Sequence, residues 1–179
     1  KVTGCPALST LGIQKNELTS LDLTACDGDL ENVYASENKL SSIKLLASHQ
    51  YLFLNDNQLT SIDLSACKSL ESIELGNNKL TALDLTGLDQ LSEVNVYKNN
   101  IQGENMKKLV ASLVDKKDSF SAGSLYAVQT RDPKEMNLCT ADDVKTAKDK
   151  NWNILDHRTW ANYPGAMLRT IKCRTEGNG

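Results

Sequence analysis

Features that would indicate a membrane or nucleic-acid partner are missing from this sequence of 179 residues. No stretch approaches the roughly 18 to 20 consecutive apolar residues that a membrane-spanning helix requires. Lysine and arginine together number 20 against 23 acidic residues, and no basic cluster could follow a phosphate backbone. The sequence therefore predicts neither a membrane-spanning segment nor a nucleic-acid partner.

Residues that commonly carry catalysis are also scarce. The only two histidines, His49 and His157, do not belong to a spaced arrangement with Ser, Asp or Cys that would support nucleophilic catalysis. A glycine-rich loop that could cradle a phosphate group is absent as well. The sequence therefore predicts neither an active site nor a cofactor.

What the sequence does contain is an internal repeat with a period near 21 residues. Five copies of the pattern Leu-x-x-Leu-x-Leu-x-x-Asn-x-Leu-x-x-Leu-x-Leu align, although the fifth copy stops after Ile101 and His49 replaces the leading Leu of the third. Self-similarity at such a period is typical of solenoids, in which each repeat buries its leucines against the next. We expect His49 to be partly buried in one rung of the solenoid.

Each half of the repeat predicts extended chain. The Leu-x-Leu segment predicts a short strand whose alternate side chains enter a shared core. The asparagine that follows is predicted to bond backbone groups that the turn leaves unpaired. The second half also alternates, as in Ser61-Ile62-Asp63-Leu64, so the return segments on the convex side are predicted to be extended rather than helical.

These motifs, over about residues 8 to 101, resemble the leucine-rich-repeat proteins of bacterial cell surfaces, internalins among them, with their repeats of 21 residues. The resemblance implies a curved solenoid, an exported location at the cell surface or outside the cell, and a role in molecular recognition. The predicted fold class is therefore α/β, a leucine-rich-repeat solenoid with a curved parallel β-sheet and a C-terminal βα capping region.

The last third of the chain departs from the repeat. Apolar residues at helical spacing predict a helix over 103–114, and a strand at 124–128, a helix with Thr140 as its N-cap and a strand at 152–155 are predicted to follow. We expect these elements to continue the parallel ladder and to cover its end. Residues 1–102 are thus predicted to be the repeats with an N-terminal cap, and residues 103–179 an α/β continuation and cap of the same solenoid.

The outward positions between the strand leucines are predicted to line the concave face, free of packing constraints. Tyr34, Tyr51 and Phe53 form one predicted aromatic patch there, out of only seven Tyr and Phe residues in the chain. Aromatic anchors are typical of recognition surfaces. The candidate binding residues are Tyr34, Tyr51, Phe53, Asn32, Asn55, Glu74 and Tyr97. The competing interpretation is that C-terminal elements cover these rings and make them part of the core.

The leading functional hypothesis is a non-enzymatic recognition module that binds a protein partner through its concave face. Glycan binding by the aromatic patch is the alternative, because flat rings flanked by Asn and Glu also suit the faces of sugars. A third hypothesis, an enzyme accessory or a purely structural spacer, would be favoured if the rings were buried.

A column of carboxylates on the return segments, at Asp22, Asp63 and Asp84, is interrupted by Lys44. Such a column could attract a hard cation, but a solvated polar face explains it equally well. We therefore predict no metal site.

Cysteine spacing limits the disulfides that can form. Cys26 and Cys67 fall in one column two rungs apart, roughly 10 Å from the strand spacing, which exceeds the reach of about 7 Å for a disulfide. We expect them not to be bonded to each other. Pairings of Cys5 with Cys26 and of Cys139 with Cys173 are compatible with the spacing, but the sequence does not decide either of them.

Overall fold

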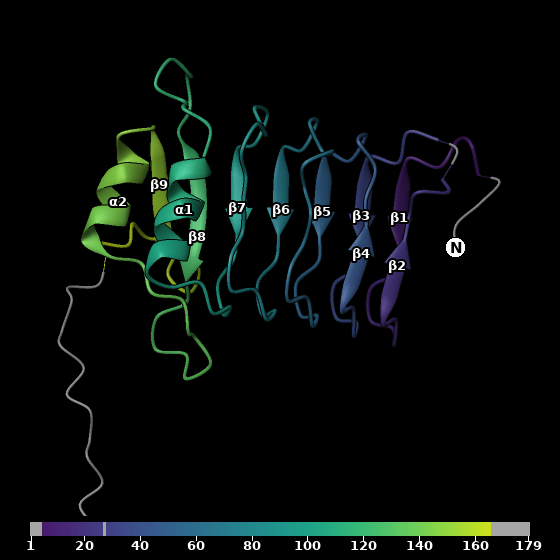
Figure 1. The fold of residues 1–179 in the computed structure, drawn as a ribbon, viewed down its shortest axis with the longest axis horizontal. Helices are drawn as coiled ribbons and strands as arrows, with labels where there is room; N and C mark the ends of the chain where they lie inside the picture. The colour runs from purple at the N-terminus through teal and green to yellow at the C-terminus, as the bar shows by residue number, and fades with distance from the viewer. Residues whose placement is uncertain (1–4, 27, 166–179) are drawn as a thin grey trace, which may run out of the picture.

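Short parallel strands stand side by side along the long axis of the molecule (Figure 1). The computed structural model describes residues 5–26 and 28–165. Seven strands form one sheet in the order β1 (Thr10–Gly12), β3 (Asn32–Tyr34), β5 (Tyr51–Phe53), β6 (Ser72–Glu74), β7 (Glu93–Asn95), β8 (Gly123–Val128) and β9 (Trp152–Asp156). Every neighbouring pair in this sheet is parallel, which confirms the predicted leucine-rich-repeat solenoid.

The core is built from the inward residue of each strand. One register row joins Val33, Leu52, Ile73, Val94, Leu125 and Ile154, and all six side chains are at most 1% exposed. Each such side chain contributes about 1.5–3 kcal/mol when it is fully buried. Leu11 of β1 is only half-buried, since no earlier strand covers it. The stack of apolar residues thus holds the rungs together, as the repeat predicted.

A ladder of asparagines ties the turns of successive rungs. In the fourth repeat Asn78 donates from Nδ2 to the carbonyls of Leu54 and Leu75, each at 3.0 Å, and its Oδ1 accepts from the amide of Leu59 at 3.0 Å. The residue that precedes each of these asparagines has positive φ, between 51° and 58° for Lys15, Glu37, Asp56, Asn77 and Lys98. The turn-bonding role predicted for asparagine is confirmed, and from Asn38 onward each side chain reaches back to the previous rung as well.

The ladder continues further than the repeats predicted. Asn137, in the segment after β8, donates to the carbonyls of Val96 and Ala127 and accepts from the amide of Ile101 at 2.8 Å. It therefore takes the place of a repeat asparagine, although Asn99 lies 38 positions earlier. The insertion of a helix between the two hid this register in the sequence.

The return segments are extended, as predicted. Two of them pair as β2 (Ser20–Asp22) and β4 (Ser42–Lys44), and residues 5–26 and 28–102 contain no helix. Asp22, Asp63 and Asp84 each accept the backbone amide two residues later, from Thr24, Ser65 and Thr86, at 2.9–3.1 Å. The column of carboxylates is therefore explained by a local turn in each repeat.

Two helices lie on the return side of the sheet at its C-terminal end (Figure 1). Helix α1 (Glu104–Ser112) buries Met106, Leu109 and Val110. Helix α2 (Ala141–Lys148) begins after Thr140, whose side chain accepts from the amide of Asp143 while the Asp143 carboxylate accepts from the amide of Thr140. The predicted N-cap is thus confirmed as part of a reciprocal capping box. Neither helix is long and apolar enough to cross a membrane, and the described residues include no other helix.

The polar and thiol groups inside the solenoid are few. His49 is fully buried, more completely than the sequence predicted, and its Nδ1 lies 2.6 Å from the carbonyl oxygen of Leu30. Cys67 is a free thiol that donates to the carbonyl of Leu46, so it is not bonded to Cys26, as predicted. Cys139 is buried with a free thiol, and its candidate partner Cys173 lies outside the described residues.

Candidate functional site

Three rows of side chains run across the face of the sheet that the helices leave open, which we call the open face. The first row joins Thr10, Asn32, Tyr51, Ser72, Glu93, Ser124 and Asn153; the second joins Gly12, Tyr34, Phe53, Glu74, Asn95, Tyr126 and Leu155. Ladder hydrogen bonds two residues further along place Ser36, Asn55, Gly76 and Tyr97 in a third row. Neighbouring positions in a row are separated by about 4.8 Å. All seven candidate binding residues from the sequence therefore lie on one face.

The centre of the predicted aromatic patch is a stack of two rings. Tyr34 and Phe53 are neighbours in the second row, with ring centroids 4.6 Å apart and planes only 6° from parallel. Tyr34 is 38% exposed and Phe53 is partly exposed, so the C-terminal elements up to residue 165 leave these rings accessible. The next residue in the row on the Tyr34 side is Gly12, which has no side chain to lie over the outer face of the tyrosine.

The other predicted residues beside this stack are held by hydrogen bonds. The hydroxyl of Tyr51 donates to the carboxylate of Glu71 at 2.6 Å, and this bond raises the pKa of the phenol. Asn32 donates from Nδ2 to the hydroxyl of Thr10 at 3.3 Å on the neighbouring strand. These contacts fix the first row around the stack.

Asn55 links the second and third rows. Its Nδ2 donates to the carboxylate of Glu74, and its Oδ1 accepts from the amide of Gly76 at 2.6 Å. Burial raises the pKa of Glu74, and the nearby carboxylate of Glu93 raises it further. Glu74 is therefore a fixed, partly buried acid next to Phe53 in the row.

A second aromatic cluster lies on the same face and includes Tyr97, Tyr126, His157 and Trp160. Tyr97 stacks on the His157 ring with centroids 3.9 Å apart, while Tyr126 meets Trp160 edge to face at 5.4 Å. Burial raises the pKa of Tyr97 to about 12, and burial together with nearby Lys98 lowers the pKa of His157. At neutral pH the cluster therefore consists of uncharged rings, with Trp160 67% exposed at its edge.

Three members of this cluster, Tyr126, His157 and Trp160, were missed by the sequence analysis. His157 and Trp160 lie in the turn after β9, where the amide of Asp156 donates to the carbonyl of Ala161 and the amide of Tyr163 donates to the carbonyl of Ile154. This antiparallel return carries the two rings onto the open face. No repeat pattern marks the residues after 156, so the sequence could not place His157 and Trp160. For Tyr126, the alternation of side chains along its strand could have predicted a position on the open face.

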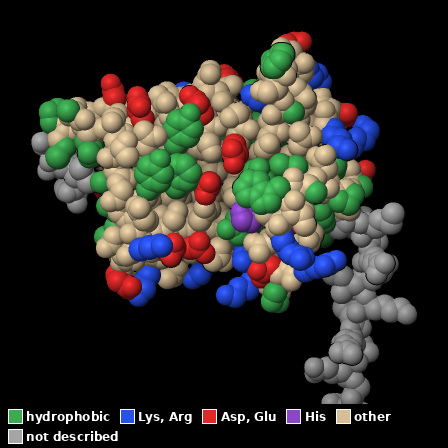
Figure 2. Space-filling model, turned by 180° about the vertical axis from the view of Figure 1, so that it is seen from behind, with side chains coloured by type: hydrophobic (Ala, Val, Ile, Leu, Met, Phe, Trp, Pro, Cys, Tyr) green, Lys and Arg blue, Asp and Glu red, His purple; other side chains and the backbone are tan. Residues whose placement is uncertain are grey.

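Acidic side chains separate the two clusters. Figure 2 shows the open face with two hydrophobic groups, acidic side chains between them and a histidine at the border of the second group. Glu74 and Glu93 occupy adjacent strands, β6 and β7, between Phe53 and Tyr126. The face thus alternates aromatic, acidic and aromatic along the solenoid.

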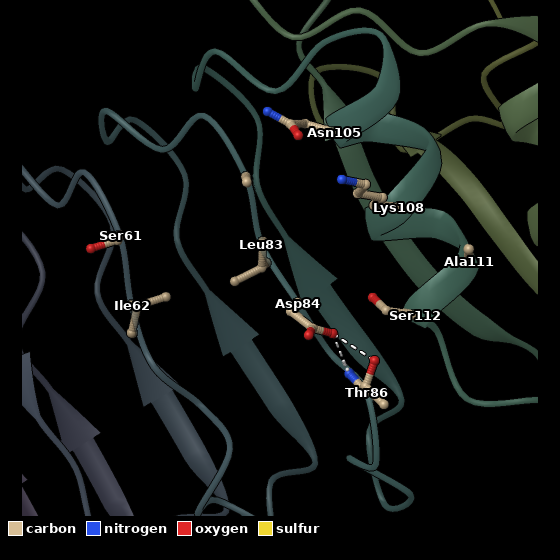
Figure 3. Close-up of a pocket in the computed structure, with 10 residues that line it drawn as sticks. Ser61, Ile62, Leu83, Asp84, Thr86, Asn105, Lys108, Ala111 and Ser112 are labelled. Carbon is tan, nitrogen blue, oxygen red and sulfur yellow. Dashed lines mark hydrogen bonds between the residues drawn. The ribbon is translucent and has the colours of Figure 1, made fainter.

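A groove of about 540 Å³ is open on the opposite side, between the return segments and α1 (Figure 3). Ile62, Leu83 and Ala111 give it apolar walls, and Asp84 and Ser112 are among its polar groups. Both polar side chains are already committed, because Asp84 accepts from Thr86 and Ser112 accepts from the amide of Leu85. These two polar groups of the groove are therefore already hydrogen-bonded within the chain.

The described residues contain no group of three or more His, Cys, Asp or Glu side chains arranged to hold a metal ion. Of their two histidines, His49 contacts the carbonyl of Leu30 through Nδ1 and leaves its buried Nε2 without a hydrogen-bond partner in the described part of the chain, and His157 stacks on Tyr97. What the open face provides is contact area, hydrogen-bonding groups and negative charge.

Comparison with known proteins supports the leucine-rich-repeat fold. Residues 50–90 match a family model described as leucine rich repeats in two copies. A search of curated proteins found no match. The matched segment contains β5 and β6 with their return segments, so the family model and the structure identify the same repeat. Leucine-rich repeats generally serve protein–protein recognition and are typically not enzymes.

Proposed function

We propose that this chain is a non-enzymatic recognition module that binds a protein partner through the open face of its sheet, the face that the sequence predicted to be concave. The observation that carries the proposal is the stack of Tyr34 on Phe53, two large rings on the sheet of which the first is exposed and the second partly exposed. Aromatic side chains held rigid lose little conformational entropy on binding and dominate the energetics of many interfaces.

The second cluster enlarges the proposed interface. Tyr126 lies three strands from Phe53 in the same row, a span of about 14 Å. A protein surface or extended peptide can cover both clusters at once, whereas a small ligand would contact only one. The hydrogen bonds of Tyr51 and Asn55 keep the polar surroundings ordered, which lowers the entropy cost of association.

The proposal is tested by selecting linear peptides from a phage-displayed library on the immobilised chain. Selected peptides are then measured by surface plasmon resonance on the wild-type chain and on the double variant Tyr34→Ser/Phe53→Ser. Loss of two central aromatic anchors is expected to weaken binding at least about ten-fold. Phe120→Ser is the matched control, because Phe120 is fully exposed and lies in the loop before β8, outside the three rows. Peptides that bind the double variant as tightly as wild type would contradict the proposal.

Glycan binding is the second candidate, favoured by the position of Tyr34 beside Gly12. Because Gly12 places no side chain of its own over the ring, Tyr34 offers a flat platform of the kind that sugar rings cover. A glycan array probed with the wild-type chain and the same double variant separates the two candidates. Glycan signals that disappear in the variant, with no peptide selected, would favour the glycan.

We also propose that the protein is exported and acts at a cell surface or outside the cell, as its resemblance to internalins implies. Fractionation of the source cells followed by detection with an antibody tests this part. Recovery of the protein in the cytosol alone would contradict it.

A further inference from the structure

The acidic positions between the two aromatic clusters have a defined composition. Between Phe53 and Tyr126 the second row contains Glu74 and Asn95. Glu93 lies in the first row, on the same strand as Asn95 and two residues before it. In the third row, Gly76 has no side chain, and the Tyr97 ring occupies the space where a Cβ would lie. We call Glu74, Glu93 and Asn95 the acidic strip.

The acidic strip has no cation of its own. The described residues form seven ion pairs, and their acids are Glu17, Asp22, Glu37, Glu104, Asp115, Asp132 and Asp149, so neither Glu74 nor Glu93 has a basic partner there. None of the three rows contains Lys or Arg. In the second aromatic cluster, burial and then Lys98 lower the pKa of His157, so this ring supplies no charge at neutral pH. Two carboxylates thus stand on the open face without a basic partner among the described residues, although Asn55 donates a hydrogen bond to Glu74.

Asn95 provides a second, independent sign of a ligand. Its side chain is only 5% exposed, and its buried Oδ1 has no hydrogen-bond partner among the described residues. Its register position places it on the open face between Glu74 and Tyr126. A buried amide oxygen without a donor costs free energy, so a donor from outside the chain would be stabilised there once a shift of neighbouring side chains admits it.

We propose that the acidic strip receives the guanidinium group of an arginine side chain of the protein partner. This inference rests on the proposed function and specifies the partner's chemistry. The guanidinium has five N–H donors in a fixed plane, enough to bond Glu74, Glu93 and the amide oxygen of Asn95 together. It is also weakly hydrated and packs against aromatic rings, which flank the strip on both sides.

Other occupants fit the strip less well. A sugar would satisfy the amide but would leave both carboxylates without a cation. A lysine ammonium would supply charge but has only three donors, on a compact and strongly hydrated group without the flat face that lets a guanidinium stack on rings. The planar, multiply donating cation matches all of the groups present.

The direct test uses N-acetyl-arginine amide as the probe and the ¹⁵N-labelled chain, followed by NMR. Saturable shifts are expected at the side-chain amide of Asn95 and the backbone amides of Glu74 and Glu93. N-acetyl-citrulline amide, which has a similar shape without charge, is expected to bind at least about ten-fold more weakly, because hydrogen bonds to charged groups are stronger. Binding of citrulline amide or N-acetyl-lysine amide as tightly as the arginine probe would overturn the proposal, as would shifts outside the strip.

Variants locate the charge. Glu74→Gln/Glu93→Gln keeps acceptors for Asn55 and removes both charges, and we expect it to weaken the arginine probe about ten-fold. Glu104→Gln is the matched control, since Glu104 is an exposed acid on α1 that pairs with Lys107. Unchanged binding to the double variant, with its NMR spectrum still that of a folded chain, would overturn the proposal.

The outcomes also separate this inference from the proposed function. Selected peptides that depend on Tyr34 and Phe53, together with no arginine binding at the strip, would leave the recognition face in place and remove the arginine site. Arginine binding at the strip with no peptide dependent on the two rings would instead remove the aromatic anchors from the proposal.

Discussion

The ring of Tyr97 lies directly on Gly76, its neighbour in the third row, so that a Cβ at residue 76 would overlap the ring. The opposite partner of the ring is His157, stacked at 3.9 Å. Tyr97 is therefore held between a glycine and an imidazole, and the second aromatic cluster depends on the absence of one methyl group.

We expect Gly76→Ala to destabilise the chain by about 1–3 kcal/mol, the usual cost of inserting a methyl group into a packed site. Urea unfolding measures the stability, and the NMR signals of the His157 ring report whether Tyr97 has moved. Gly12→Ala is the matched control on the same face, because a Cβ there meets only Oε1 of Gln14 at 3.4 Å. Equal effects of the two substitutions would show that Tyr97 is not packed on residue 76.

The asparagine ladder predicts a large stability difference between two chemically identical substitutions. Asn78→Ala leaves the amide of Leu59 and the carbonyls of Leu54 and Leu75 without this partner inside the core. Each such buried group costs about 1–3 kcal/mol, so we expect a total loss of at least about 2 kcal/mol in the free energy of unfolding.

Asn16→Ala is the control for the ladder. Asn16 is exposed and its Nδ2 bonds only Ile13 and Gln14 in its own turn, so its loss is expected to cost less than about 1 kcal/mol. Urea unfolding of both variants checks the difference. A cost for Asn16 equal to that for Asn78 would contradict a ladder that links rungs.

His49 predicts a dependence of stability on pH. Burial lowers its pKa below the ordinary 6.5, so the folded state resists protonation of a ring that titrates freely when unfolded. The stability contributed by neutral His49 is therefore present above about pH 6.5 and is lost as the pH falls through and below that value.

His49→Leu restores the residue found at the start of the other repeats and removes this loss. The carbonyl of Leu30 keeps a donor in the variant, the hydroxyl of Ser48 at 3.2 Å. Melting temperatures of both chains at pH 7.5 and 5.5 test the prediction, and wild type should lose more on acidification than the variant. An identical loss in both would exclude His49 as the source.

The capping box of α2 predicts a cost for Thr140→Ala. The hydroxyl accepts from the amide of Asp143 at 3.2 Å, and its removal leaves that amide without a cap. The expected destabilisation is about 1 kcal/mol, measured by urea unfolding. Thr146→Ala, in the exposed middle of the same helix, should be neutral, because alanine is the better helix former there. Equal losses would place the effect elsewhere than in the cap.

The repeat alone determined most of the fold and one half of the candidate site. A period of about 21 residues requires each rung to bury its leucines against the next, so strand positions, the parallel register and the outward placement of Tyr34, Tyr51 and Phe53 all follow from spacing. Thr140 and its acidic first turn likewise marked the start of α2 from local chemistry.

Tertiary structure decided the other half. Asn137 rejoined the ladder because α1 and β8 together span one enlarged rung, a length that no repeat spacing encodes. His157 and Trp160 reached the open face because the chain turns back antiparallel along β9, and the partnerless amide of Asn95 depends on what packs around it. Such contacts join residues far apart in sequence, whereas a repeat pattern specifies only the spacing between neighbouring rungs.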